Sequence, residues 1–185
     1  MHSPINKMGY ELKSADDIAM PAPAFAPQPF SPPAYSLRVS NGSNFPGIDQ
    51  TGPAATFDKL QPVFLGLAHV EGGLHPCKVL PHFAPTPVRV GYGGGERSVD
   101  TDFFVVPVDA SRMEWVAASH GRTPEGRTPV EAGHENDGTP LYHAVALVDG
   151  LPVPGKCGPG LRSAHVPYGG VELVREYYQI LCWRL

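Results

Sequence analysis

Two acidic residues, each followed about twenty positions later by a lysine, are the side chains of this sequence best placed to bind a polar ligand. Asp137 precedes Lys156, and Asp58 precedes Lys78. A carboxylate accepts hydrogen bonds and an ammonium group donates them, so the two together can hold adjacent hydroxyl groups, each of which donates and accepts. Each pair therefore predicts a small site for a hydroxyl-rich ligand.

Both members of the second pair also have an ordinary structural interpretation. Asp137 lies in the sequence Asn-Asp-Gly at residues 136–138, which is typical of a turn. Lys156 could be a charge at the end of a strand that pairs with Glu172. Glu135, next to Asp137, is a further candidate for the rim of a site. The residues alone leave the binding and the structural interpretations open.

The two lysines occupy equivalent places in an internal repeat. Residues 62–78 align with residues 140–156 without a gap, and six of the seventeen aligned positions are identical. Unrelated segments of this composition would share about one or two. The motif Tyr-Gly-Gly-x-Glu follows in both copies, at residues 92–96 and 168–172. The chain therefore contains one structural unit twice.

The glutamates that end these motifs, Glu96 and Glu172, are expected to support the lysines. The motif has the glycines of a phosphate-binding loop, but it lacks the lysine and hydroxyl residue of such a loop, and no helix is predicted after it. We interpret the glycines as structural.

The elements that carry these residues are predicted to be short strands. The chain has 21 glycines and 22 prolines, while 42% of its residues are hydrophobic, a mixture typical of strands joined by tight turns. Glu-Gly-Gly at residues 71–73 and Asp-Gly at residues 149–150 predict a hairpin in each copy, which would fold each lysine back toward its acidic partner. The only helix candidate, residues 173–178, ranks below strand. The strand-length apolar runs are residues 35–39, 63–70, 74–80, 88–90, 103–108, 113–117, 141–148, 171–174 and 177–183.

The second copy resembles the DM-nine repeat family. The resemblance is carried by Trp115, residues 129–133, Asp-Gly at 137–138, Leu-Tyr at 141–142, Pro-Gly-Lys at 154–156 and Tyr-Gly-Gly-Val-Glu at 168–172. It implies an all-β fold in which tandem repeats, at about residues 35–108 and 113–185, form one β-sandwich-like domain with pseudo-two-fold symmetry. It also implies a lectin-like protein that recognises mannose-type sugars without a metal, and extends the expected ligand-binding set to Asp137, Lys156, Asp58, Lys78, Glu135 and Glu172.

The first copy departs from the family pattern. Cys77 stands where the second copy has the glycine before lysine, and Asp-Lys-Leu at residues 58–60 replaces Asp-Gly. With Pro62 held against Pro140, Asp137 aligns with Lys59, so Asp58 becomes its equivalent only after a shift of one residue. The site of the first copy is therefore less well defined than that of the second.

Several other function classes are not expected. A net charge of -4 with 14 scattered basic residues gives no footprint for nucleic acid. The eight histidines and three cysteines show no metal-ligand spacing, and no nucleophile has a suitable context, so we expect no metal, no cofactor and no enzyme activity. No apolar run reaches the length of a membrane span or of a signal peptide. We expect a cytoplasmic protein, or one secreted by an unconventional route.

A proline-rich segment precedes the repeats, and we assign residues 1–34 to an extended arm. Its prolines, dense between residues 20 and 34, oppose both helix and interior strand. An alternative function follows from this arm: a non-catalytic scaffold or protein-interaction module in which the arm engages a partner or a second copy of the chain in a homodimer.

Overall fold

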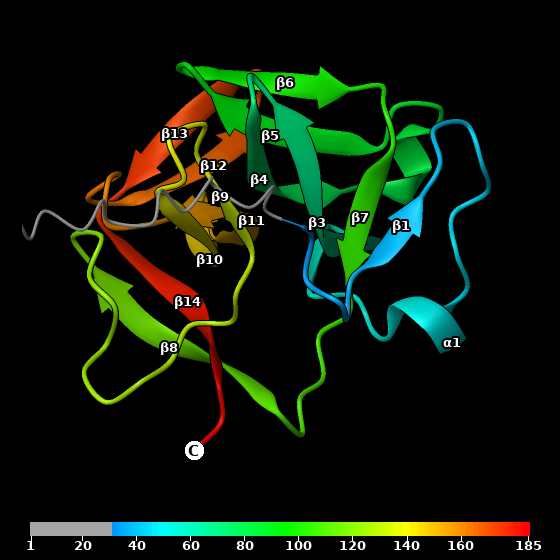
Figure 1. Cartoon of the computed structure of the whole chain (residues 1–185). Coiled ribbons are helices and arrows are strands. Elements are labelled where there is room, and N and C mark those ends of the chain that lie inside the picture. Colours follow the sequence, from blue (N-terminus) through cyan, green and yellow to red (C-terminus); the bar gives the residue numbers. More distant parts are fainter. Residues whose placement is uncertain (1–30) are drawn as a thin grey trace, which may run out of the picture.

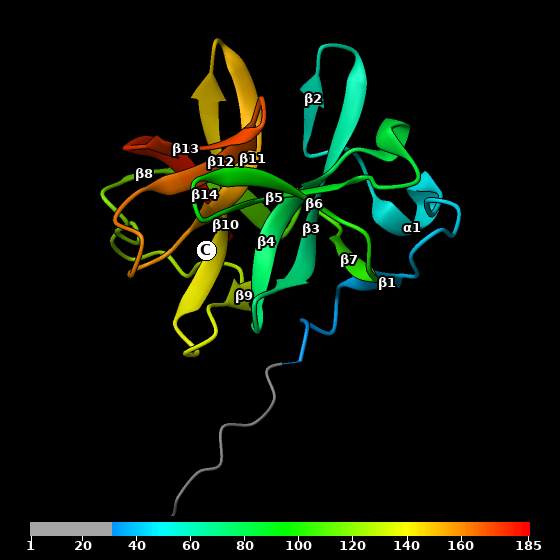
Figure 2. The ribbon, with the colours of Figure 1, turned by 90° about the horizontal axis from the view of Figure 1, so that it is seen from above.

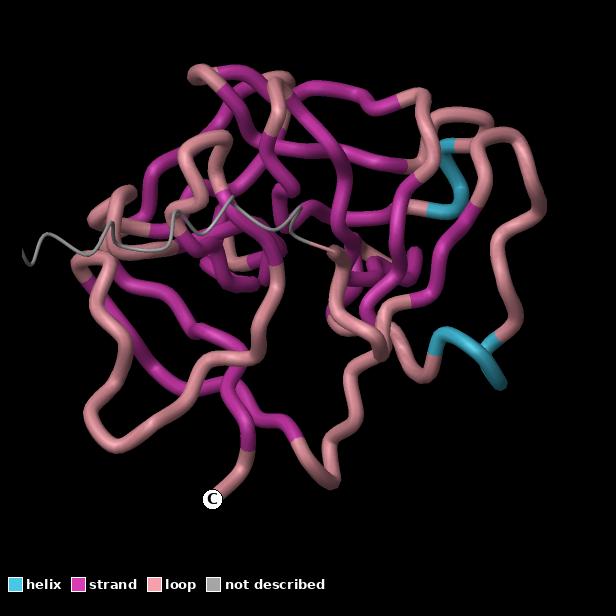
Figure 3. The backbone as a smooth tube through the Cα atoms, in the orientation of Figure 1, coloured by secondary structure: helices cyan, strands magenta, loops and turns pink. Residues whose placement is uncertain are grey.

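The computed structural model describes residues 31–185, so most of the expected proline-rich arm lies outside the described residues. The described chain is built almost entirely of β-strands joined by tight turns (Figures 1 and 3). Its helices are a four-residue α1 at Ile48–Thr51 and a 3-10 helix at Pro81–Phe83. The all-β prediction is confirmed.

Each repeat supplies a matching series of strands. In the first repeat these are β1 (Leu37–Val39), β2 (Thr56–Asp58), β3 (Gln61–Val70), β4 (Gly73–Val79), β5 (Val88–Tyr92), β6 (Gly95–Val99) and β7 (Phe103–Val106). In the second they are β8 (Met113–Ser119), β9 (Gly133–His134), β10 (Pro140–Val148), β11 (Leu151–Cys157), β12 (Ala164–Tyr168), β13 (Val171–Arg175) and β14 (Tyr177–Trp183).

The strands form one continuous sheet in which equivalent strands of the two repeats occupy mirrored positions. The order is β1-β7-β3-β4-β5-β6 followed by β13-β12-β11-β10-β14-β8. Every strand of the first half therefore has a counterpart at the mirrored place of the second half. The halves join edge to edge where Val171 of β13 pairs with Gly95 of β6. This junction lies on the pseudo-two-fold axis that the internal repeat predicts, and the two halves sit side by side in Figure 1.

The predicted hairpins are present and have the same register. Ala68 faces His75 across β3 and β4, and Ala146 faces Val153 across β10 and β11. The turns place Glu71 at φ 48° and Asp149 at φ 50°, as the twisted two-residue turns of hairpins require. An identical register fixes which side chains of the two repeats are equivalent.

The short strands β2 and β9 each contact both repeats. β2 pairs with β3 of its own repeat and lies against β11 of the other, while β9 pairs with β10 and also with β4. Figure 2 shows the result: the β2–β3 and β10–β11 hairpins project together on one side of the molecule, and the β3–β4 tip lies beside β9 on the other. Any pocket at these places is lined by both repeats.

The core has one cluster for each repeat and a third that both repeats share. Val79 and Val88 belong to the first cluster, Ala144 and Val166 to the second. The shared cluster joins Leu65 of β3 with residues such as Leu181 of β14. Because strand residues alternate between faces, one face of β3 and β4 packs within its repeat, and the other faces the second repeat.

Several elements leave no signal in the sequence, whereas one segment that could have been helical is strand as predicted. Residues 173–178 form the end of β13 and the start of β14, so the ranking of strand above helix is confirmed. The strands β2, β6, β9 and β12 and both helices were not predicted, and β11 was predicted only as the second arm of a hairpin. The missed strands are short, polar or rich in proline and glycine, so hydrophobic periodicity gives them no signal. Within residues 31–185, neither helix has the length or apolar character needed to cross a membrane.

We predict that His143 makes the fold sensitive to acid. This side chain is fully buried, and burial lowers its pKa from 6.5 to about 3. Between these values the unfolded chain binds a proton that the folded protein does not, so stability is retained above pH 6.5 and is lost as the pH falls below it. At pH 5 the loss from this group is about 2 kcal/mol.

Replacement of His143 by leucine should remove that loss. The equivalent residue of the first repeat is Leu65, since Leu65 faces Lys78 as His143 faces Lys156. Urea unfolding of both proteins at pH 7 and pH 5 measures the effect. An equal loss of unfolding free energy in His143→Leu and the unmodified protein would contradict the prediction.

Candidate functional site

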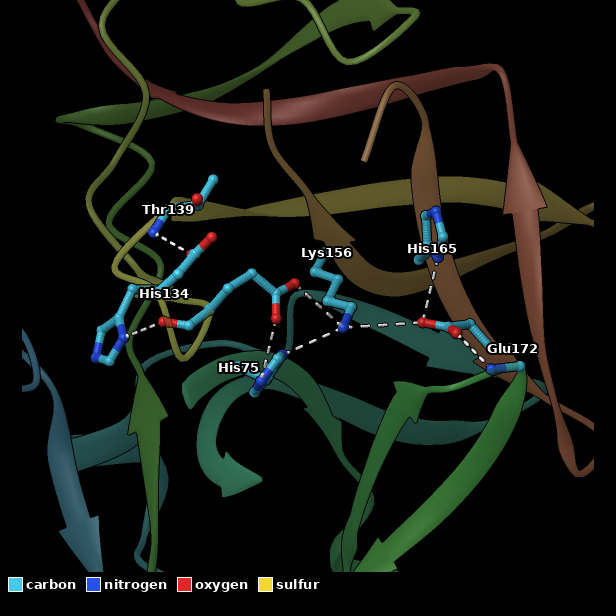
Figure 4. Close-up of polar contacts among 9 residues, drawn as sticks. His75, His134, Thr139, Lys156, His165 and Glu172 are labelled. Atoms are coloured by element: carbon cyan, nitrogen blue, oxygen red, sulfur yellow. Dashed lines mark hydrogen bonds and ion pairs between the residues drawn. The ribbon is translucent and has the colours of Figure 1, made fainter. Parts of the chain in front are cut away.

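The second repeat buries its lysine at the boundary between the two repeats. Lys156 lies on β11, facing His143 of β10 and His165 of β12 across the sheet. Its side chain is only 4% exposed. The Nζ atom reaches into the first repeat and lies 3.1 Å from Nδ1 of His75 on β4 (Figure 4). Glycine at position 155 lets β11 pack closely against β12, because a Cβ there would overlap the carbonyl oxygen of His165.

Two carboxylates flank the Lys156 ammonium without bonding to it directly. Nζ is 3.9 Å from Oε1 of Glu135 and 3.8 Å from Oε1 of Glu172, distances that are too long for a hydrogen bond. Burial lowers the pKa of Lys156, and the two carboxylates oppose that shift by favouring the charged form. The carboxylates therefore stabilise the charge while leaving donor capacity on the ammonium.

Glu172 is held in place from both repeats. Its Oε2 accepts a hydrogen bond from the backbone amide of Gly94 at 2.9 Å, and its Oε1 lies 3.2 Å from Nδ1 of His165. Burial alone would raise the pKa of Glu172, but the hydrogen bonds from His165 and Gly94 and the charge of Lys156 bring it below its ordinary value. Glu172 is thus the fixed anion of the site.

His75 supplies a neutral acceptor from the first repeat. Burial and then the nearby Lys156 charge lower its pKa from 6.5 to about 4, so the ring is neutral at physiological pH and its Nδ1 can accept from Lys156. The ring of Tyr92 stands edge-on to His75, with centroids 5.2 Å apart, and its centroid is also 5.2 Å from Lys156 Nζ. His75 and Tyr92 together orient the lysine from across the repeat boundary.

The equivalent lysine of the first repeat makes two short polar contacts. Lys78 Nζ donates to the carbonyl oxygen of Pro167 at 2.6 Å and lies 3.0 Å from Oε1 of Glu96. The ring of Tyr168, the counterpart of Tyr92, lies 5.6 Å from the same nitrogen. The first site has the backbone of the second, but its ammonium already has short contacts.

The two glutamates also join the repeats to each other. Glu96 Oε2 accepts from the amide of Gly170 at 2.8 Å, as Glu172 Oε2 accepts from Gly94. The backbone repeats this exchange, since the amide of Glu96 donates to Gly170 and that of Glu172 to Gly94. Gly94 has a φ of 83° and Gly170 a φ of 85°, in turns that glycine favours. The expectation that Glu96 and Glu172 support the lysines is met in the geometry of both sites.

Asp137 does not lie where the sequence analysis placed it. Its Oδ1 accepts from the backbone amide of Thr139 at 2.9 Å (Figure 4), and the side chain is exposed. This hydrogen bond lowers the pKa of Asp137, as expected of a turn carboxylate. Among residues 31–185 the carboxylates within 4 Å of Lys156 are those of Glu135 and Glu172. The expected Asp137–Lys156 pair is therefore replaced by Glu135 and Lys156.

The strand register explains this replacement. Phe57 faces Pro62 across β2 and β3, and His134 faces Pro140 across β9 and β10. Phe57 and His134 are therefore equivalent, and so are the residues that follow them, Asp58 and Glu135. The one-residue shift assumed for Asp58 was wrong because it sought a counterpart for Asp137, which belongs to the turn. Asp58 and Lys78 do line the same pocket, although their charged groups are not within 4 Å of each other.

Sequence reasoning missed the residues that the opposite repeat contributes. His75 and Tyr92 of the first repeat lie beside Lys156, but alignment of the repeats shows only equivalence and not contact across the axis. His165 of β12, in the same repeat as Lys156, was also missed. His75 could have been noticed because its counterpart, Val153, is apolar. Among residues 31–185 no group of three histidine, cysteine, aspartate or glutamate side chains has metal-binding geometry.

The chain is similar to a known protein family and to a solved structure. The sequence model of the DM9 repeat family matches residues 58–183, so the chain belongs to that family. Among solved structures, the crystal structure of the nematode sperm cell motility protein MFP2B is similar, with a TM-score of 0.59 and 17% identity over 80% of this chain and 45% of that one. At this identity the similarity shows a common fold, and the chain spans less than half the length of that protein. No match was found among curated proteins.

We predict that removing the charge of either glutamate destabilises the protein. Glu96→Gln and Glu172→Gln keep the shape of the side chain but leave a buried lysine without its fixed anion. The expected cost is about 2–4 kcal/mol of unfolding free energy, with the larger loss at Glu96, which is in direct contact with Lys78. Asp102→Asn, which removes an exposed ion pair with Arg38, is the control and should cost far less. Urea unfolding in which Glu96→Gln matches the unmodified protein would contradict the prediction.

Proposed function

We propose that this chain is a non-catalytic carbohydrate-binding protein and that a mannose-type sugar binds at Lys156. The observation that carries the proposal is the position of the ammonium between Glu135 and Glu172, at 3.9 and 3.8 Å. A hydroxyl oxygen between Nζ and either carboxylate can lie about 2.8 Å from both, accepting from the lysine and donating to the glutamate. Adjacent sugar hydroxyls can occupy both gaps.

The surrounding side chains favour a neutral polar ligand. The Glu135 side chain is 28% exposed and His165 is 19% exposed, so a ligand would approach Lys156 from their side. Tyr92 supplies a ring over the lysine, a surface on which apolar C–H groups of a sugar can pack. The two carboxylates disfavour an anionic ligand. The proposal needs no metal, because Lys156, Glu135 and Glu172 supply both donors and acceptors.

We do not extend the proposal to the first repeat, although the sequence analysis expected a second sugar site at Asp58 and Lys78. Lys78 already donates to Pro167 and contacts Glu96. A sugar there would have to replace these short contacts. At Lys156 it would instead form hydrogen bonds that the ammonium does not yet make to the carboxylates. We therefore propose one sugar site per chain instead of two.

Sugar titration of single-residue variants tests the proposal. Lys156→Met removes the donors at nearly constant length, and Glu135→Gln removes the charge at the exposed side of the site. Each should weaken methyl α-mannoside binding at least tenfold in isothermal titration calorimetry, because each hydrogen bond to a charged group contributes about 1.5–3 kcal/mol. Lys59→Met changes an exposed lysine on the β2–β3 turn and should leave affinity unchanged.

The same titration measures stoichiometry and metal dependence. The expected result is one sugar per chain, with equal affinity in EDTA. A protein that binds no mannose, or one in which Lys156→Met binds as tightly as the unmodified chain, would refute the proposal. A measured stoichiometry of two sugars per chain would instead support the sequence prediction of one sugar site in each repeat.

A further inference from the structure

The rim of the Lys156 site extends from Glu135 onto the tip of the β3–β4 hairpin. Asn136 follows Glu135 in the chain, and its side chain packs against Gly72 in the turn of that hairpin, since a Cβ on Gly72 would lie 2.5 Å from Oδ1 of Asn136. Figure 2 shows the β3–β4 tip beside β9, the strand that precedes Glu135. The hairpin tip of the first repeat therefore borders the exposed side of the sugar site.

Arg97 of β6 continues this rim on the other side of the hairpin tip. Its guanidinium lies over the ring of Tyr92, with Cζ 4.7 Å from the ring centroid, and its Nη1 donates to Oε1 of Glu71 at 3.3 Å. Glu71 precedes Gly72 in the turn, so Arg97 is tied to the tip that also contacts Asn136. Successive contacts thus connect Arg97 to the rim of the sugar site.

The Tyr92 ring is shared by the sugar site and by Arg97. Its centroid is 5.2 Å from Nζ of Lys156 and 4.7 Å from Cζ of Arg97. The two cationic groups are therefore at most about 10 Å apart, because both distances are measured from the same point. A glycan whose first residue lies at Lys156 can place its second residue within reach of Arg97.

The ion pair of Arg97 and Glu71 is one in which a ligand can take part. The two side chains are 45% and 62% exposed, and water screens such exposed pairs so that they contribute little to stability. A hydroxyl group can accept from the guanidinium and donate to the carboxylate. The guanidinium also has further N–H donors beside the one that Glu71 accepts. Both charged groups are consequently available to a neutral hydroxyl-rich ligand.

The equivalent place in the first repeat has no such cation. There the Lys78 pocket, which Asp58 and Lys78 line, is the counterpart of the sugar site. Leu173 stands in the place of Arg97, one residue after the glutamate of the repeated motif, and packs against the core of the second repeat. The rim cation is thus a feature of the Lys156 site that the repeat does not impose.

We propose that Glu71, Arg97 and Asn136 form a second subsite of the sugar site, which binds the neighbouring residue of a glycan. The inference rests on the proposed function at Lys156 and narrows its ligand to a neutral saccharide of two or more residues. Arg97 donates to hydroxyl groups of the second residue, and the side-chain oxygens of Glu71 and Asn136 accept from them. A monosaccharide at Lys156 leaves these groups unused.

Calorimetry with monosaccharide and disaccharide ligands tests the inference on the full chain. The probes are methyl α-mannoside and mannobiose with α-1,2, α-1,3 or α-1,6 linkage. We expect at least one mannobiose to bind about fivefold more tightly than methyl α-mannoside, because it adds a hydrogen bond to an exposed charged group. The ratio of the two affinities should fall to about one in Arg97→Leu, which copies Leu173, since the added bond is lost.

Arg38→Leu is the matched control, because Arg38 is also an exposed arginine in an ion pair, with Asp102 on the far edge of the first repeat. It should keep the fivefold ratio of the unmodified chain. In two-dimensional NMR the side-chain Nε–H signal of Arg97 should shift with the preferred mannobiose and not with methyl α-mannoside.

Two results would overturn the inference. One is equal affinity of every mannobiose and of methyl α-mannoside for the unmodified chain. The other is a ratio of affinities that stays the same in Arg97→Leu. Both leave the proposed function standing, because that function is tested separately by the loss of methyl α-mannoside binding in Lys156→Met.

Discussion

The exchange of contacts between Glu96 and Glu172 across the pseudo-two-fold axis is the interaction on which the arrangement depends. Each carboxylate uses one oxygen for the glycine turn of the other repeat and directs the second toward the lysine of its own. A buried ammonium is costly unless an anion balances it. The lysines can be buried only when the glutamates are fixed, and the glutamates are fixed only when the β6 and β13 edges meet. The buried charges are thus balanced only when the two repeats assemble.

This requirement explains why the duplicated unit has kept some residues and changed others. Loss of a lysine or of a glutamate would leave a buried charge unpaired, so both repeats retain them. Residues around the charges carry no such penalty. His75 and Val153 occupy the same register position, one accepting from a lysine and the other forming an apolar wall. A common backbone therefore surrounds the two lysines with different side chains.

Both sites lie between the repeats and are completed by the opposite one. Lys156 receives His75 and Tyr92 from the first repeat, and the Lys78 pocket receives Leu151 and Tyr168 from the second. The crossed pairing of β2 and β9 brings the acidic residues Asp58 and Glu135 to these boundaries. One repeat alone would carry the lysine and the glutamate but not the walls. The surroundings of each lysine are consequently a property of the pair of repeats.

The sequence by itself determined the all-β class, the duplication, the two hairpins and the equivalence of the two lysines and of the two glutamates, because each leaves a local or repeated pattern. Alternating apolar runs and turn residues indicate the structure of neighbouring residues along the chain. The repeat indicates which positions of the two copies are equivalent. Neither reports which residues meet across the axis. The tertiary structure therefore decided that Glu135 and not Asp137 faces Lys156, since a register set by β9 and β10 assigns Asp137 to the turn. It also decided that Lys78 contacts a carbonyl oxygen and a carboxylate directly while Lys156 lies farther from its carboxylates, because that difference depends on backbone and side-chain groups brought together from segments far apart in the chain.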